Sequence, residues 1–247
     1  MIDFLAPFFT GALRPYAERL HVTAPAQTPR ADWAVECLAR LSQATRCADL
    51  RALAAAWFRD YTMAVVPGAL VAAAVHRRRL PFDWAVPRIA QEGWLESLVL
   101  PDGGEPAVTT LPALLSPLMN RHLPDVVAAL ATAGRVSQRL LWCTGGVAAS
   151  GIARQLAAHP ALDAAGRAEV LAWIDHAVSA DGYPNPLHGA FRAGMEPGSP
   201  GIAPVRRICC LNYRLPAGEH CGTCPRVAVN PVPNDPSRAT AATATTR

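Results

Sequence analysis

Residues 50–78 form a largely apolar stretch that reads LRALAAAWFRDYTMAVVPGALVAAAVHRR. Between Leu50 and Tyr61 the apolar residues recur at intervals of three and four, which predicts a helix that buries one stripe of its surface. From about Pro67 to Arg78 the residues are small and apolar, and we expect a second, separate helix there. A helical core built around this stretch is therefore the first expectation.

Helical patterns also flank this stretch on both sides. Thr28 followed by Pro29 is a typical helix start, with threonine as the N-cap and proline in the first turn. The pair Gly145-Gly146 is expected to break the longest downstream pattern. The predicted helices cover residues 1–20 in part, 28–41, 109–118, 124–133, 135–159 on both sides of the break, and 164–180.

The segment from Phe82 to Leu100 has a different pattern. Aromatic and branched residues surround a turn at Gly93, which indicates a β-hairpin whose Pro87 either confines the first strand to an edge or ends it. Residues 181–204 are rich in proline and glycine and predict irregular structure. We therefore predict a predominantly helical α+β fold with a small antiparallel β-hairpin in the middle.

The composition sets limits on partners and location. The 247 residues are 51% hydrophobic and 17% charged, with a formal net charge of +4 and no lysine, which is typical of one large globular domain. The densest basic run, residues 76–79, is short and follows an apolar helix, so no nucleic-acid partner is expected. The N-terminus lacks a secretory pattern, and the apolar run 63–75 is shorter than the about 20 residues that span a bilayer. We expect a cytoplasmic protein without a transmembrane segment, which leaves open a peripheral contact with a membrane.

The chemistry lies in a cysteine unit near the C-terminus, residues 206–225, which reads RRICCLNYRLPAGEHCGTCP. Its thiols are spaced C-C-x10-C-x2-C at Cys209, Cys210, Cys221 and Cys224. In a reducing compartment such crowding favours metal binding or redox chemistry over disulfides. Four thiolates suit a [2Fe–2S] cluster with two per iron, but they also suit structural zinc, and a dithiol motif at the last pair is a third reading. Spacing alone favours iron–sulfur and leaves zinc open.

The neighbours of these cysteines modestly favour a redox centre. Four arginines, at positions 206, 207, 214 and 226, stand against a single acid, Glu219. Guanidinium groups beside a cluster would stabilise an added electron and raise its reduction potential, although solvation of an exposed loop explains these arginines equally well. Gly222 is expected to give the C-x2-C turn its freedom, and His188 and His220 are candidates for lying near the cluster.

The pattern Arg206-Arg207-x-Cys209-Cys210-Leu211-x-Tyr213-Arg214, followed by Cys221-Gly222-Thr223-Cys224-Pro225, resembles the C-terminal signature of the FhuF-like ferric-siderophore reductases. The resemblance implies a cytoplasmic enzyme that reduces Fe(III) in an imported siderophore, of the hydroxamate type, and releases Fe(II). It also implies that Cys209, Cys210, Cys221 and Cys224 ligate a [2Fe–2S] cluster. The expected organisation is a helical domain over 1–204, a C-terminal iron–sulfur-binding loop over 205–227 and a disordered tail over 231–247.

Two further expectations concern electrons and substrate. No G-x-G-x-x-G opens a βαβ unit, so we expect a separate electron donor such as a ferredoxin or a flavoprotein reductase. Arg135, Arg139 and Trp142 could supply the polar contacts and aromatic wall of a siderophore pocket, although core packing with surface arginines explains them as well. Alternative functions are an iron–sulfur sensor of redox state or iron, and a zinc-stabilised interaction module.

Overall fold

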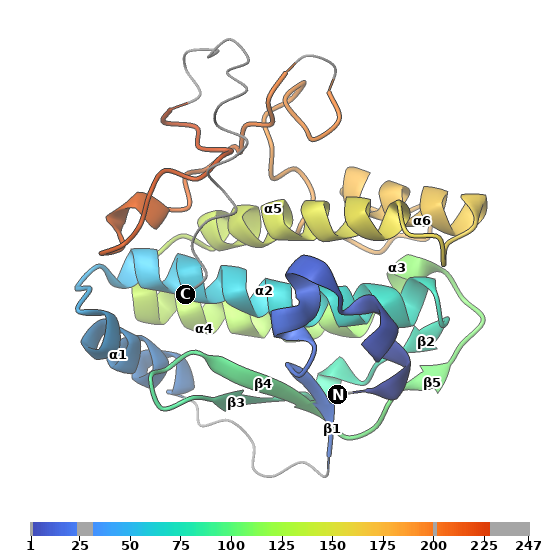
Figure 1. Cartoon of the computed structure of the whole chain (residues 1–247), viewed down its shortest axis with the longest axis horizontal. Coiled ribbons are helices and arrows are strands. Elements are labelled where there is room, and N and C mark those ends of the chain that lie inside the picture. Colours follow the sequence, from blue (N-terminus) through green and yellow to red (C-terminus); the bar gives the residue numbers. More distant parts are fainter. Residues whose placement is uncertain (1, 24–31, 200–201, 228–247) are drawn as a thin grey trace.

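The computed structural model describes residues 2–23, 32–199 and 202–227. Helix α2 (Leu50–Ala74) runs through the middle of the molecule, with α5 and α6 on one side and the strands on the other (Figure 1). The surrounding helices all contact it. Their bounds are α1 (Trp33–Thr45), α3 (Leu111–Pro117), α4 (Leu123–Gly134), α5 (Gln138–Ala157) and α6 (Ala164–Asp175). The predicted helix-rich α+β class is confirmed.

Helix α2 is continuous, so the prediction of two separate helices is wrong. Asp49 caps its start by accepting bonds from the backbone N–H groups of Arg51 (3.1 Å) and Ala52 (3.2 Å). Pro67 lies inside the helix and removes one backbone hydrogen bond. The helix persists because its second half is buried on all sides, and packing outweighs this local loss. Residues 52–58 in its first half are also all buried, so the core encloses more of α2 than the predicted single stripe.

The predicted hairpin is confirmed and forms part of a three-stranded sheet. Strands β3 (Val86–Ile89) and β4 (Leu95–Leu100) pair antiparallel, and Pro87 lies on the edge strand as expected. A third strand that no sequence pattern predicts, β1 (Leu20–Val22), pairs parallel to β4 on its other side. Three residues are too few to show a strand period, so only tertiary pairing defines β1.

The N-terminal segment and the basic run also differ from expectation. In place of one short helix within residues 1–20 there are two 3-10 helices, η1 (Asp3–Phe8) and η2 (Gly11–Tyr16), each of which contains a proline. Strand β2 (Arg78–Arg79) pairs antiparallel with β5 (Glu105–Pro106), so the basic run continues into a short ribbon. The Thr28-Pro29 helix start and the tail 231–247 lie outside the described residues.

Helix α5 passes through Gly145-Gly146 without a break, contrary to the prediction. A Cβ at Gly145 would lie 2.7 Å from Cε1 of Phe58, and one at Gly146 would lie 2.3 Å from the carbonyl oxygen of Leu187. The two glycines therefore allow α2 and the segment after α6 to pack closely against α5. This close packing requires them, although glycine lowers helix propensity.

Helix α6 ends at Asp175, five residues before the predicted end, and Val178 is exposed rather than buried on its inner face.

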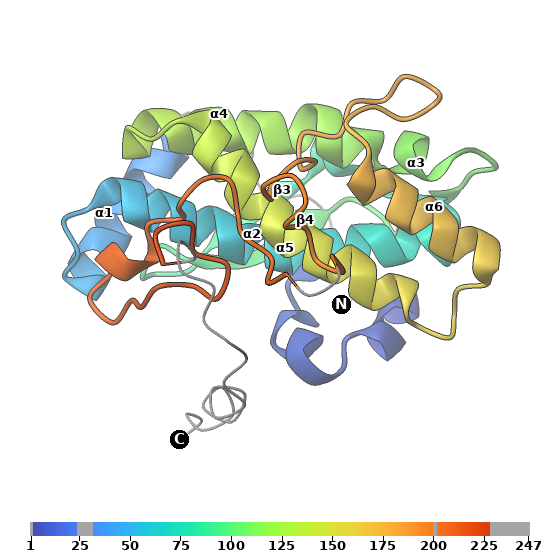
Figure 2. The ribbon, with the colours of Figure 1, turned by 90° about the horizontal axis from the view of Figure 1, so that it is seen from above.

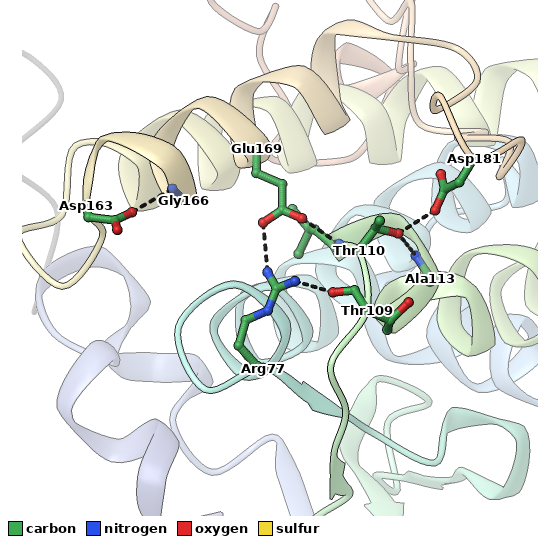
Figure 3. A network of polar contacts seen from close by, with 9 residues as sticks. Arg77, Thr109, Thr110, Ala113, Asp163, Gly166, Glu169 and Asp181 are labelled. Atoms are coloured by element: carbon green, nitrogen blue, oxygen red, sulfur yellow. Dashed lines mark hydrogen bonds and ion pairs between the residues drawn. The ribbon is translucent and has the colours of Figure 1, made fainter.

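Glu169 anchors α6 by accepting bonds from Arg77 (2.7 Å) and from the backbone N–H of Leu111 (2.7 Å) (Figure 3). This network joins α6 to the segment after α2 and to the start of α3. The predicted irregular structure after α6 is confirmed.

Candidate metal centre

The cysteine unit lies over α5 and the N-terminal half of α2 (Figures 1 and 2). Two polar contacts attach it to α2. Nε of Arg214 lies 2.7 Å from Oδ2 of Asp49, and Nη1 of Arg59 donates to Oδ1 of Asn212 at 3.0 Å. The loop between the second and third cysteines is therefore docked on the helical body.

The ten-residue spacer closes on itself. Leu211 adopts a left-handed conformation (φ 61°) directly after the paired cysteines and starts the 3-10 turn η5 (Asn212–Arg214). The side-chain amide of Asn212 donates to the backbone carbonyl of Glu219 at 2.9 Å. A Cβ at Gly218 would lie 1.8 Å from the carbonyl oxygen of Asn212, so this position requires glycine.

The structure gives no such reason for glycine at 222, contrary to the prediction. A Cβ there would meet nothing within 4 Å, and Gly222 is absent from the residues with positive φ. The turn is instead held by a backbone bond from the N–H of Cys224 to the carbonyl of Cys221 (2.9 Å).

Backbone pairing brings the two cysteine pairs together. The N–H of Arg206 donates to the carbonyl of Thr223 at 3.0 Å, and Sγ of Cys210 lies 3.6 Å from Sγ of Cys221. Two thiolates on one tetrahedral metal are about 3.8 Å apart, given metal–sulfur bonds of about 2.3 Å. Within the described ranges, no three side chains of His, Cys, Asp or Glu already converge as a cage. Cluster binding would therefore require Cys209 and Cys224 to turn their thiols toward the 210–221 pair.

The thiols differ in their electrostatic environment. The pKa of Cys221 is lowered to about 5, because Cys210 donates its S–H to this sulfur and the positive charge of Arg206 is close. The same hydrogen bond, together with burial, raises the pKa of Cys210. Burial also raises the pKa of Cys209. The site therefore favours a thiolate at Cys221 before any metal is bound.

Arg206 shows that the site suits a negatively charged group. This arginine is 3% exposed, and its Nη1 lies 3.9 Å from Sγ of Cys221. Its buried Nε has no hydrogen-bond partner in the part of the chain that the structure describes. A buried charge is costly unless it is paired, and a cluster held by four thiolates, with a formal charge near −2 when oxidised, would pair it. The donor set and this arginine therefore fit a [2Fe–2S] cluster.

The other arginines of the unit have different partners. Arg207 is exposed and donates to the carbonyl of Gly189 at 3.3 Å, and Arg214 pairs with Asp49 as described. Arg226 lies over the ring of Tyr213 at 5.0 Å. His220 stacks on the same ring, also at 5.0 Å, so it is held beside the cysteines. Two features of the unit have no signal in the sequence. Arg206 is the only one of the four arginines that is buried, and Gly218 is the glycine that the loop requires.

The nominated pocket residues Arg135, Arg139 and Trp142 lie at the end of α4 and the start of α5. Arg135 is the left-handed C-cap of α4 and lines a shallow depression together with Asp49 and Arg214. Arg139 is exposed, and Trp142 packs edge-on against Phe58 at 6.0 Å. Their role in substrate binding stays a prediction.

Comparison with known families adds two matches. A family described as "Ferric iron reductase FhuF-like transporter" matches residues 55–188, and one described as "FhuF 2Fe-2S C-terminal domain" matches residues 206–226, which include all four cysteines of the unit. A search of curated proteins found no match. The second match supports a [2Fe–2S] cluster as the cofactor over zinc. Among the described residues, no helix has the length and apolar character needed to cross a bilayer.

Proposed function

The chain belongs to the FhuF-like family of ferric iron reductases, and we propose that it reduces Fe(III) in an imported siderophore, of the hydroxamate type, in the cytoplasm. Cys209, Cys210, Cys221 and Cys224 hold the [2Fe–2S] cluster on the segment 205–227, and residues 1–204 form the helical body that carries it. The observation that carries this assignment is the buried Arg206 beside the sulfur of Cys221.

The reaction needs a single electron. A cluster held by the four cysteines would supply that electron, and Fe(III) in the siderophore would become Fe(II). Siderophores bind iron through hard oxygen donors, which hold Fe(III) much more tightly than Fe(II), so the reduced iron is released. No bond to carbon is made or broken. The protein therefore has to position the complex near the cluster, and it needs no acid–base residue.

The electron reaches this chain from a separate donor. Gly145-Gly146 lies inside α5 and packs against α2 and Leu187, so it is not a phosphate-binding loop. A ferredoxin or a flavoprotein reductase is the proposed donor. Exposed Arg207, Arg214 and Arg226 around the cysteine unit would complement an acidic donor surface.

Anaerobic mixing tests the function directly. The purified protein is reduced, then mixed with a ferric trihydroxamate while the visible absorption of the cluster and the release of Fe(II) to a ferrous chelator are followed. We expect one Fe(II) per cluster reoxidised, and no reaction with the gallium(III) complex, which cannot accept the electron. Reoxidation no faster than in siderophore-free buffer would contradict the proposal.

The ligand assignment is tested by replacing each of the four cysteines with serine. We expect iron and sulfide per chain to fall well below the wild-type value in each variant. Cys37→Ser is the matched control, because Cys37 is a buried thiol on α1, away from the cysteine unit. Full iron content in any of the four variants would remove that residue from the ligand set.

A further inference from the structure

A groove of about 860 Å³ lies beside the cysteine unit. Its walls are the middle of α5, the end of α6 and the segment 187–197. Sites for small ligands have volumes of about 300 to 1,000 Å³, so the groove is large enough for a siderophore complex. The polar side chains on its walls come from Ser150, Arg154, Asp175, His188, Arg192, Glu196 and Arg207.

One wall of the groove is continuous with the cysteine unit. The N–H of Arg207 donates to the carbonyl of Ala190 (2.9 Å), and the N–H of Arg192 donates to the carbonyl of Val205 (2.8 Å). This ladder joins the segment that lines the groove to the strand-like segment that leads into the cysteines. Arg207 lines the groove two residues before Cys209, which corresponds to at most about 7 Å of extended chain. An iron complex held here would lie near the proposed cluster ligands.

The groove also carries basic groups that are available to a ligand. Arg154 is paired with Asp175 at 2.8 Å. Neither Arg192 nor Arg207 forms an ion pair with any described residue, and both are exposed. The three guanidinium groups face two carboxylates, those of Asp175 and Glu196, which leaves a formal excess of positive charge.

A second cavity, of about 540 Å³, offers a contrast. It lies between α3, α6 and the segment after α6, and its charged walls are the carboxylates Glu169 and Asp181. Asp181 is one of the acids in the network drawn in Figure 3. This cavity has no arginine on its walls and no residue of the cysteine unit. Its charge would disfavour a ligand with anionic oxygens.

We propose that the groove between α5, α6 and residues 187–197 binds the Fe(III) chelate, with Arg192 and Arg207 donating hydrogen bonds to the anionic oxygen donors around the iron. This inference rests on the proposed function and adds to it the place and the chemistry of recognition. Chelates with a net negative charge bind more tightly than neutral ones, because the guanidinium groups are in excess. Arg192 and Arg207 are positioning residues that hold the complex beside the cysteine unit.

The test uses gallium(III) complexes, which imitate the charge and shape of the ferric complexes but cannot be reduced. Binding to the full-length protein with its oxidised cluster is measured by calorimetry, with a neutral gallium trihydroxamate and a trianionic gallium tris-catecholate. We expect both to bind, the second more tightly and with the steeper dependence on salt. Each of Arg192→Gln and Arg207→Gln should weaken binding roughly tenfold, the usual effect of losing one charge-assisted hydrogen bond.

Two further variants separate the groove from general effects of charge or folding. Ala193→Trp fills the groove from an exposed position and should abolish binding without a change in charge. Arg167→Gln, on the exposed surface of α6, removes the same charge outside the groove and should leave affinity unchanged. An unaltered cluster spectrum shows that each variant is folded.

In the binding experiment, two outcomes overturn the groove assignment: no gallium complex binds the wild type, or the groove variants bind as tightly as Arg167→Gln. Weakened gallium binding in the groove variants, together with no reoxidation of the reduced cluster by the ferric complex, would leave the groove in place and reject the reductase function. Reoxidation that is insensitive to all groove variants would reject the groove and leave the function in place.

Discussion

Replacing Arg206 with methionine should lower the reduction potential of the cluster. Nη1 of Arg206 lies 3.9 Å from Sγ of Cys221, and the side chain is buried, so solvent screens its charge poorly. Methionine keeps much of the volume without the charge and without a new unpaired donor. Losing a nearby positive charge makes the added electron less favourable.

The magnitude follows from Coulomb's law. Adding a metal–sulfur bond of about 2 Å places the guanidinium about 6 Å from the charge of the cluster. At an effective dielectric constant of about 20, two unit charges at that separation interact by about 3 kcal/mol. For a one-electron couple this corresponds to a fall of about 120 mV in reduction potential.

The assay is an anaerobic redox titration that follows the visible absorption of the cluster. Arg206→Lys keeps the charge and should shift the potential much less than Arg206→Met. Arg226→Gln removes an exposed charge beside Tyr213, and solvent screening should reduce its effect to a small fraction of the shift. An Arg206→Met protein with an intact cluster spectrum and an unchanged reduction potential would show that the charge of Arg206 does not act on the cluster.

Three further predictions concern the loop, the core and the bundle end. Gly218→Ala should lower the iron content per chain, because the added Cβ would overlap the carbonyl of Asn212. Gly222→Ala should keep the wild-type iron content, and equal losses in the two variants would contradict the role of Gly218. Burial lowers the pKa of His122 to about 4, below its ordinary value of 6.5. As the pH falls, His122 is therefore protonated in the unfolded chain before it is protonated in the folded protein. The free energy of unfolding is thus highest above about pH 6.5 and falls as the pH drops toward 4. Between pH 7 and pH 5 this imidazole should lower the free energy of unfolding, measured with urea, by about 2 kcal/mol, and the decrease should be smaller in His122→Phe. Equal pH dependence of the unfolding free energy in the wild type and the variant would show that His122 is not responsible. Glu169→Gln removes a half-exposed ion pair with Arg77 and should lower the free energy of unfolding by about 1 kcal/mol. Glu36→Gln, which removes an exposed ion pair within α1, should have a smaller effect, and similar losses would show that the network around Glu169 adds no stability beyond an exposed pair.

Much of the fold class could be read from local patterns. The hairpin from Val86 to Leu100 was predictable because alternation and a glycine turn are properties of neighbouring residues. The continuity of α2 through Pro67 and of α5 through Gly145-Gly146 was not, because both depend on elements that are remote in the sequence and pack from every side.

The candidate site divides in the same way. The number and spacing of Cys209, Cys210, Cys221 and Cys224 are written in the chain, since these residues lie within sixteen positions of one another. Local patterns in the chain therefore predict a helix-rich α+β protein with a four-thiolate unit near its C-terminus.

Only the tertiary structure distinguished Arg206 from its neighbouring arginines and joined the wall of the groove to the cysteine unit. Both results depend on the pairing of residues 190–192 with residues 205–207 and on the packing of this ladder near α5. Burial and juxtaposition are properties of segments that are distant in the sequence, and local patterns carry no information about which segments meet.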